Sequence, residues 1–280
     1  MRVKKYSGEL VPFNPDSLRH SLSRSGATKE QVDGVYRAIQ AQLYDGISTR
    51  ELYELAFDCL KKQREVYAAR YSLKKALREL GPEGFYFERW IAKLFADDGY
   101  ETLTSQTIRG HAVTHEVDVV AAKANDLLAI ECKFRNDVDA KISVTTPMYF
   151  MSRLKDISAL PFRFFGREHM FTKGWLVTNA YFTSDAKSFG EYYQLNLLSW
   201  DYPADKSIKL RVDDNGLYPI TCLTTLSAAE KAVLLKHACI LVRDLIQIPK
   251  FLQHVDLSKE QAAHVLMEAQ ELLQSPVNVE

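Results

Sequence analysis

The chain has 280 residues, of which 46% are hydrophobic and 26% are charged. This composition is typical of folded globular domains and argues against a disordered or low-complexity chain. Lys and Arg together number 36, as do Asp and Glu, so the formal net charge is zero and no overall basic excess points to a nucleic-acid partner.

The charge is unevenly distributed along the chain. Residues 1–80 hold 15 Lys and Arg against 10 Asp and Glu, whereas the remaining residues hold 21 against 26. The first segment therefore has a net charge of +5 and the rest has −5, which predicts that the N-terminal segment prefers an anionic ligand.

The cysteines and the chain start bear on the cellular compartment. Cys59, Cys132, Cys222 and Cys239 are scattered, with no CxxC pair at zinc-binding spacing, which indicates buried thiols of a reduced protein. The start MRVKKYSGELVPF does not resemble a signal peptide, and no run approaches the roughly 20 apolar residues of a membrane span. We therefore expect a cytoplasmic protein with no membrane partner.

The first 81 residues are predicted to form a small helical domain. Short extended segments flank a turn at Ser7-Gly8, and Asn14-Pro15-Asp16 is typical of a helix start. Apolar spacing then predicts amphipathic helices at about 16–25, 29–44, 49–62 and 64–79. Gly81-Pro82 stops the fourth helix and is the clearest domain boundary in the sequence.

The pattern after this boundary changes to strands mixed with helices. A helix is expected at about 83–97, followed by strands at about 100–107, 114–122, 127–135 and 174–178, with helices near 146–157 and 183–194. This order predicts an α/β domain over 82–220. Residues 224–275 have no strand pattern and predict four short helices, so 221–280 is expected to be a small all-helical domain.

Two of the expected strands carry paired acidic and basic residues. In LLAIECKFR, alternation places Glu131 and Lys133 on one face and Cys132 on the other. Asp118 lies in the preceding strand, EVDVVAA, so antiparallel pairing can bring it beside Glu131. Adjacent carboxylates repel unless a cation lies between them, and hard oxygen ligands suit Mg²⁺ or Mn²⁺.

This arrangement matches what phosphodiester hydrolysis requires. A metal ion held by Asp118 and Glu131 is expected to activate a water and to stabilise charge on the phosphoryl oxygens. Lys133 could position or deprotonate that water, or neutralise the phosphate. Taken alone, each residue has a simpler interpretation, because an E-x-K on a strand is often a solvent-facing ion pair.

The spacing D-x12-E-x-K resembles that of the PD-(D/E)xK nucleases, and more narrowly the Mrr-like restriction endonucleases. The resemblance includes GFYFERWIAKLF, in which Glu88 matches a first-helix glutamate of the family, and GWLVTNAYFTSDAKSFGEYY followed by LNLLSWD. It extends over about 83–203. It implies an α/β/α core with a mixed central sheet, a DNA substrate, and Glu88 as a further catalytic and metal-binding residue.

One segment departs from the family pattern. The usual Gly-rich approach to the aspartate is here GHAVTHEVD, which contains His111, His115 and Glu116. These residues either add metal or phosphate contacts or only alter the loop.

Residues 1–80 resemble an ATP cone, the nucleotide-binding regulatory module known from ribonucleotide reductases. The matching stretches are VKKYSGELVPFN, YDGISTRELYE and YAARYSLKKALREL. Tyr6 and Ser7 replace the usual Arg-Asp, and Ser17 stands where a lysine is common, with Arg19 as a substitute nearby. The resemblance implies that ATP or dATP binds as an effector to a set of residues comprising Val3, Lys4, Lys5, Asn14, Thr49, Tyr53 and Arg78.

The residues of this segment support an anion site independently of the resemblance. Lys4 and Lys5 lie beside a glycine turn, and a helix is expected to begin at Ser48-Thr49. Lysine side chains and a helix N-terminus both favour phosphate groups. The alternative is a basic helical module that binds DNA or packs on its neighbour. No GxxxxGK[ST] loop is present, so the nucleotide is expected to be an effector rather than a fuel.

The C-terminal segment resembles a degenerate pair of helix-hairpin-helix-like units. The glycines that define this motif are replaced by His237-Ala238 and Val255-Asp256. DNA binding and a packing or dimerisation role are both compatible with this segment.

Taken together, these features predict a multidomain chain with α+β and α/β parts. The expected function is a metal-dependent DNA endonuclease regulated by ATP or dATP. The alternative is a nucleotide-sensing DNA-binding protein with an inactive nuclease fold. A third hypothesis makes the ATP cone a switch of homo-oligomer assembly.

Overall fold

The computed structural model describes residues 1–81 and 84–274, and its internal contacts divide the chain into two units. Unit 1 combines Met1–Ala76 with Asp213–Glu280, and unit 2 comprises Leu77–Val212. The first and last segments of the chain therefore fold together. The division falls between Ala76 and Leu77, a few residues before Gly81, and Pro82 lies outside the described residues, so the boundary expected at Gly81-Pro82 stays a prediction.

Unit 1 begins with a three-stranded sheet and continues with helices whose starts the sequence marks. β1 (Arg2–Lys4) pairs antiparallel with β2 (Leu10–Pro12) and parallel with β3 (Ile47–Ser48). The residue before each helix is an N-cap, whose side chain accepts a hydrogen bond from a backbone N–H of the first turn. These N-caps are Asn14 before α1 (Pro15–Ser23), Thr28 before α2 (Lys29–Gln40) and Ser48 before α3 (Thr49–Gln63).

The helix predicted at 64–79 is divided into two in the structure. α4 (Glu65–Tyr71) ends at Ser72, and α5 (Leu73–Arg78) begins directly after it. The hydroxyl of Ser72 donates to the backbone carbonyl of Ala69 at 2.9 Å. A serine hydroxyl bonded back to the preceding turn competes with regular helix hydrogen bonding and bends the chain, which explains why apolar spacing alone did not predict the break.

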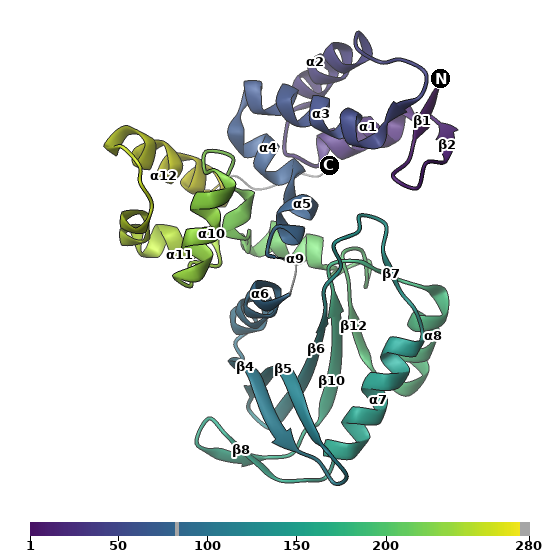
Figure 1. The fold of residues 1–280 in the computed structure, drawn as a ribbon, viewed down its shortest axis with the longest axis vertical. Helices are drawn as coiled ribbons and strands as arrows, with labels where there is room; N and C mark the ends of the chain where they lie inside the picture. Colours follow the sequence, from purple (N-terminus) through teal and green to yellow (C-terminus); the bar gives the residue numbers. More distant parts are fainter. Residues whose placement is uncertain (82–83, 275–280) are drawn as a thin grey trace. The chain divides into compact units, whose positions relative to one another are not determined.

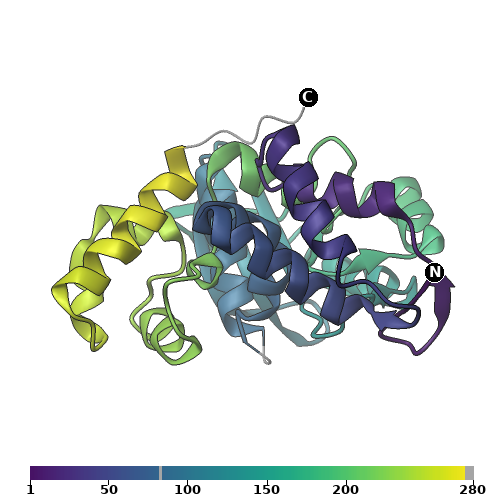
Figure 2. The same ribbon diagram turned by 90° about the horizontal axis from the view of Figure 1, so that it is seen from above.

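The C-terminal part of unit 1 is helical, as predicted. It contains α10 (Ala228–Lys236), α11 (Val242–Gln247), the 3-10 helix η2 (Pro249–His254) and α12 (Lys259–Gln274), preceded by the 3-10 helix η1 (Ile220–Cys222). α12, drawn in yellow, lies beside α11 (Figure 1, Figure 2) and also contacts α4. Among residues 1–81 and 84–274, no helix has both the length and the apolar character that crossing a bilayer requires.

Unit 2 is built around a mixed five-stranded sheet with the strand order β12-β10-β6-β5-β4. The strands β4, β5 and β6 form an antiparallel meander, whereas β6, β10 and β12 run parallel to one another. Their bounds are β4 (Glu101–Arg109), β5 (Thr114–Lys123), β6 (Asp126–Lys133), β10 (Lys173–Thr178) and β12 (Asn196–Leu198). The mixed sheet is the one predicted.

Helices cover both faces of this sheet (Figure 1). α6 (Phe85–Asp97) lies on one face, and α7 (Thr145–Ile157) and α8 (Ser184–Tyr193) lie on the other. Side-chain alternation connects the layers. On β10, Trp175 contacts Phe95 of α6 with ring centroids 5.3 Å apart, and the next residue, Leu176, belongs to the buried core that includes Phe150 of α7.

Short elements were not predicted from the sequence. They are β7 (Lys141–Ile142) paired with β11 (Tyr181–Phe182), the hairpin of β8 (Phe162–Phe164) and β9 (Arg167–His169), β3, and α9 (Ile208–Asn215). The strands among them have only two or three residues, which is too short for the alternation of apolar and polar residues to be recognised.

Candidate functional site

The predicted carboxylates Asp118 and Glu131 come from neighbouring antiparallel strands. The β5–β6 ladder pairs Val119 with Ile130, and Asp118 and Glu131 are the next residues beyond that pair. Residues opposite each other on antiparallel strands point to the same face of the sheet. The Asp118 side chain extends the contact between the strands, because its Oδ2 accepts the backbone N–H of Cys132 at 2.7 Å.

Glu131 is buried and has two cationic neighbours. Nη1 of Arg153, on α7, donates to Oε2 of Glu131, and Nζ of Lys133 lies 3.9 Å from Oε1. Nη2 of the same guanidinium donates to the backbone carbonyl of Glu116. The side chains of Glu131 and Arg153 are 9% and 15% exposed, whereas that of Lys133 is 39% exposed and reaches solvent.

Glu88 completes the predicted set from the first turn of α6. Its burial, followed by the charges of Asp118, Glu116 and Glu131, raises the pKa of Glu88 to about 7. Burial also raises the pKa of Asp118, and burial together with the Asp118 charge raises the pKa of Glu131. The fold therefore brings all four predicted residues, including Lys133, into one electrostatic cluster with Glu116 added.

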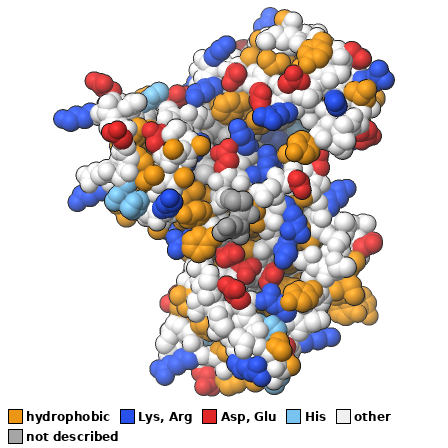
Figure 3. Space-filling model, viewed as in Figure 1, with side chains coloured by type: hydrophobic (Ala, Val, Ile, Leu, Met, Phe, Trp, Pro, Cys, Tyr) orange, Lys and Arg blue, Asp and Glu red, His pale blue; other side chains and the backbone are white. Residues whose placement is uncertain are grey.

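The cluster holds more negative than positive charge. Four carboxylates act on one another, and Arg153 and Lys133 are the cations that act on Asp118 and Glu131. On the face of the molecule drawn in Figure 3, acidic side chains gather over β5 and β6, with basic side chains beside them. Charge repulsion between partly buried carboxylates favours binding of a cation.

The donor chemistry of the cluster fits a hard divalent cation. Asp118 and Glu131 offer carboxylate oxygens from rigid strands, which Mg²⁺ and Mn²⁺ prefer. Within the described residues, no group of three or more His, Cys, Asp or Glu side chains is arranged to hold a metal ion as it stands. Because Arg153 engages an oxygen of Glu131, full coordination at that carboxylate requires the guanidinium to move.

Arg153 is not among the residues predicted from the sequence, although its position in α7 carries a recognisable pattern. Arg153 is three residues after Phe150 and four before Ile157, and both of these are buried residues of α7. A charged residue on the apolar stripe of an amphipathic helix is unusual, because burying a charge requires a partner. This pattern indicates a buried ion pair but does not identify Glu131 as the partner.

His115 has a structural partner in this fold. Its Nε2 lies 2.6 Å from Oδ2 of Asp156, near the end of α7. The Asp156 carboxylate also accepts the backbone N–H groups of Ala112 and Val113, at 2.8 and 3.2 Å. His111 contacts the carbonyl of Ser158 through Nε2 at 3.2 Å. These contacts connect the loop between β4 and β5 to α7, whereas Glu116 acts on the carboxylate cluster.

The nucleotide-binding residues predicted at the N-terminus fall on two neighbouring elements. On β1, Val3 is buried and Lys4 is exposed, and the parallel register places Lys4 opposite Ser48, the N-cap residue of α3. Thr49 is exposed at the first position of that helix. Lys5 follows β1 and forms an ion pair with Glu9 at 3.2 Å.

Three other predicted nucleotide-binding residues have their own surroundings. The side-chain oxygen of Asn14 accepts the backbone N–H groups of Asp16 and Ser17 and caps α1. The ring of Tyr53 stacks on that of Tyr71 at 5.2 Å. Arg78 falls within unit 2, unlike the other residues of this set, and its charge acts on Tyr181.

Comparison with protein families assigns three regions of the chain. Residues 1–80 match the ATP cone domain, residues 80–202 match a restriction endonuclease family, Mrr_cat, and residues 218–273 match the C-terminal region of AF1548-like proteins. The first two matches confirm the predicted order of an ATP cone followed by a restriction-endonuclease domain. The third covers α10 to most of α12.

Two proteins similar to this chain have no assigned function. An uncharacterized protein of Archaeoglobus fulgidus is 30% identical over 187 residues, which cover 65% of this chain and 99% of that protein. The crystal structure of AF1548, a protein of unknown function, has 28% sequence identity and a TM-score of 0.56, and the match covers 68% of this chain and 97% of that chain.

Proposed function

This chain belongs to the same family as the Archaeoglobus fulgidus protein and carries an ATP cone followed by a restriction-endonuclease domain, and we propose that it is a metal-dependent DNA endonuclease regulated by ATP or dATP. The observation that carries the proposal is the convergence of Glu88, Asp118, Glu131 and Lys133 from α6, β5 and β6.

The metal-binding part of the proposal rests on Asp118 and Glu131, with Glu88 beside them. Their carboxylates would hold Mg²⁺ or Mn²⁺, which supplies Lewis acidity and lowers the pKa of a water molecule when bound. The raised pKa values of Asp118 and Glu131 support this role, because a bound cation would stabilise the ionised carboxylates against the burial and repulsion that raise these values.

Lys133 and Glu88 have distinct roles in this proposal. The Lys133 side chain reaches solvent, so its ammonium group can meet a phosphate oxygen or orient an attacking water. In the metal-free protein the pKa of Glu88 is raised to about 7, so this carboxyl group can exchange a proton near neutral pH before a cation binds beside it. We therefore assign the phosphate contact to Lys133 and proton exchange with the solvent to Glu88.

Regulation by a nucleotide rests on the N-terminal residues. Lys4 lies opposite the N-cap residue of α3, so a cationic side chain and the positive end of a 15-residue helix are adjacent. Both features favour phosphate groups. For the nucleotide to act as an effector, it must bind two states of the protein with different affinity.

Cleavage of supercoiled plasmid DNA tests the enzyme assignment. We expect nicking in Mg²⁺ or Mn²⁺ and none in EDTA, and we expect Lys133→Ala to lower the rate by about 100-fold or more. Lys141→Ala, which changes an exposed lysine of unit 2, is the matched control. Undiminished cleavage by Lys133→Ala would contradict the assignment. No cleavage by the wild type under any condition would favour a nucleotide-sensing DNA-binding protein with an inactive nuclease fold.

The same assay with ATP or dATP tests regulation. We expect the nucleotide to change the nicking rate and Lys4→Ala to reduce that change, because the phosphate groups lose a cationic partner. Lys29→Ala, at the start of α2, is the control, since this lysine is exposed and lies outside the predicted site. Equal responses of the two variants would remove Lys4 from the nucleotide site.

A further inference from the structure

Arg153 lies beside the carboxylate cluster, at the place where the proposed nuclease would bind the phosphate of its substrate. Its guanidinium joins the buried carboxylate of Glu131 and the backbone carbonyl of Glu116, so it touches both strands of the acidic cluster. The side chain is 15% exposed, so it is mostly buried but retains some contact with solvent. The planar fork of an arginine can bind either carboxylate or phosphate oxygens through two parallel hydrogen bonds.

Glu131 has two competing uses in the proposed nuclease. It is a ligand of the divalent cation, and it is also the ion-pair partner of Arg153. A divalent cation bound at Glu131 would take over the neutralisation of this carboxylate and would repel the guanidinium. Arg153 would then need another anion, since an unpaired buried charge is strongly destabilising.

The surroundings of Arg153 permit such a movement. Tyr149, one helical turn earlier on α7, is 66% exposed, and its ring centroid lies 5.9 Å from Cζ of Arg153. An aromatic face offers a guanidinium a favourable contact outside the ion pair. Asp156, on the next turn, fixes α7 to the β4–β5 loop, so the helix can stay in place while the side chain changes partner.

We propose that Arg153 is a phosphate-binding residue of this site, which neutralises Glu131 in the metal-free protein and transfers to the scissile phosphate of DNA when a divalent cation binds. The proposal rests on the endonuclease function proposed above. It adds a residue from α7 to the set taken from α6, β5 and β6.

Binding of Mn²⁺ tests the competition for Glu131. Titration of the EDTA-stripped protein should show that Arg153→Gln binds Mn²⁺ as tightly as the wild type or more tightly, because a competing cation is removed. The Mn²⁺-induced rise in melting temperature should follow this affinity and be as large as in the wild type or larger, because Glu131 no longer has its ion-pair partner Arg153. Lys155→Gln, on the exposed side of the same helix, is the control.

Affinity for a fluorescein-labelled DNA duplex tests the transfer to phosphate. Measured in the Lys133→Ala background to prevent cleavage, Arg153→Gln should weaken DNA binding about tenfold in Mn²⁺ and little in EDTA, as expected for loss of a charge-assisted phosphate contact. Arg153→Lys should recover part of the affinity, because it keeps the charge but not the planar fork. Cleavage by Arg153→Gln in the otherwise wild-type protein should fall by about 100-fold.

Three results would overturn the proposal. The first is Mn²⁺ affinity that falls in Arg153→Gln, which would make Arg153 a support for the metal-binding glutamate. The second is an equal loss of DNA affinity with and without Mn²⁺, and the third is unchanged DNA affinity in Mn²⁺. If the wild type cleaves no DNA, the endonuclease function fails, whereas the Mn²⁺ and DNA-binding measurements still decide the role of Arg153.

Discussion

At the scale of single residues, the acidic cluster is defined by its charge balance. Burial and the neighbouring carboxylates Asp118, Glu88 and Glu131 also raise the pKa of the Cys132 thiol well above its usual value. A thiol with a raised pKa is neutral and a poor nucleophile. Alternation with Glu131 and Lys133 predicts that Cys132 lies on the opposite face of the strand, where its side chain is partly buried.

Glu88 should make the stability of the metal-free protein depend on pH. Its pKa is about 7 in the fold against an ordinary value of 4.5, so the unfolded chain releases a proton that the folded protein keeps. The free energy of unfolding therefore falls as pH rises from about 4.5 to 7, and the contribution of Glu88 to this decrease reaches its full size above pH 7. Glu88→Gln removes this loss.

Melting temperatures in EDTA between pH 4 and pH 8, in about half-unit steps, would check this linkage. The advantage of Glu88→Gln over the wild type should grow through the window and become constant above it. Glu101→Gln, at the exposed start of β4, is the control. A difference that does not vary with pH would contradict the raised pKa of Glu88.

At the level of elements, α7 is connected to the strands of the site through two of its residues, Arg153 and Asp156. Arg153 reaches β5 and β6, and Asp156 reaches the β4–β5 loop through two backbone N–H groups and His115. Gly110 is required in this loop, because a Cβ at that position would lie 2.2 Å from Oδ2 of Asp156. His115 thus acts through the loop, which favours the structural one of the two roles considered from the sequence.

Asp156→Asn should loosen the β4–β5 loop. The contact with His115, followed by the backbone hydrogen bond from Ala112, lowers the pKa of Asp156 to about 2 from an ordinary value of 3.8. A lowered pKa contributes stability that is present above 3.8 and is lost as pH falls through about 2. The variant should therefore lose stability at neutral pH and converge with the wild type in acid.

Hydrogen exchange of the Ala112 and Val113 amides would measure this effect directly, because both donate to Asp156. Exchange should accelerate in Asp156→Asn and remain unchanged in Asp205→Asn, which alters an exposed aspartate of the same unit. Unchanged exchange in Asp156→Asn would show that the loop is held by other contacts.

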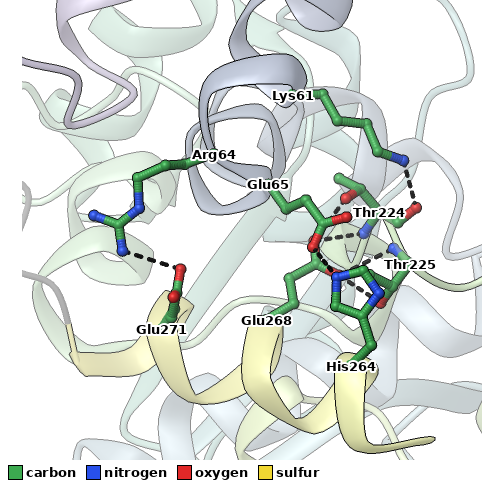
Figure 4. Close-up of polar contacts among 8 residues, drawn as sticks. All are labelled: Lys61, Arg64, Glu65, Thr224, Thr225, His264, Glu268 and Glu271. Atoms are coloured by element: carbon green, nitrogen blue, oxygen red, sulfur yellow. Dashed lines mark hydrogen bonds and ion pairs between the residues drawn. The ribbon is translucent and has the colours of Figure 1, made fainter. Parts of the chain in front are cut away.

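At the scale of the whole molecule, unit 1 joins the two ends of the sequence. Figure 4 shows the polar contacts that α12 makes with α4 and with the segment before α10. Glu268 is 2% exposed and accepts hydrogen bonds from the backbone N–H and hydroxyl of both Thr224 and Thr225. Lys61 of α3 donates to the carbonyl of Thr224, and Arg64 pairs with Glu271.

Glu268→Ala should destabilise unit 1 far more than Glu271→Ala. The first variant leaves four donors around a buried position without their acceptor, which costs about 2–4 kcal/mol. The second removes a half-exposed ion pair with Arg64, which contributes about 1 kcal/mol or less. Calorimetry of the full chain would compare the two variants, and equal unfolding temperatures would contradict the role of Glu268.

Stability of the ATP cone should therefore depend on the C-terminal helices. The family comparisons treat residues 1–80 and 218–273 as separate regions, whereas the contacts of Lys61 and Arg64 place both in one unit. A nucleotide that binds the folded cone stabilises the whole unit by mass action. The melting temperature in ATP should rise for the transition that Glu268→Ala lowers.

Short-range patterns in the sequence are enough to predict the local elements and the site residues carried by β6. Helix starts at Asn14 and Ser48 follow from side chains that accept the first free N–H groups. The placement of Glu131 and Lys133 on one face follows from the two-residue period of a strand. Both signals come from residues a few positions apart, so no knowledge of the rest of the chain is needed.

Contacts between residues far apart in the sequence become visible only in the folded chain. Arg153 joins Glu131 across 22 positions, and Glu268 joins Thr224 across 44. The pKa of Glu88 depends on burial and on carboxylates from two strands, and Arg78 is grouped with unit 2 although the ATP-cone pattern includes it. Such contacts depend on how layers pack and how far charges are from water, and these quantities have no short-range period in the sequence.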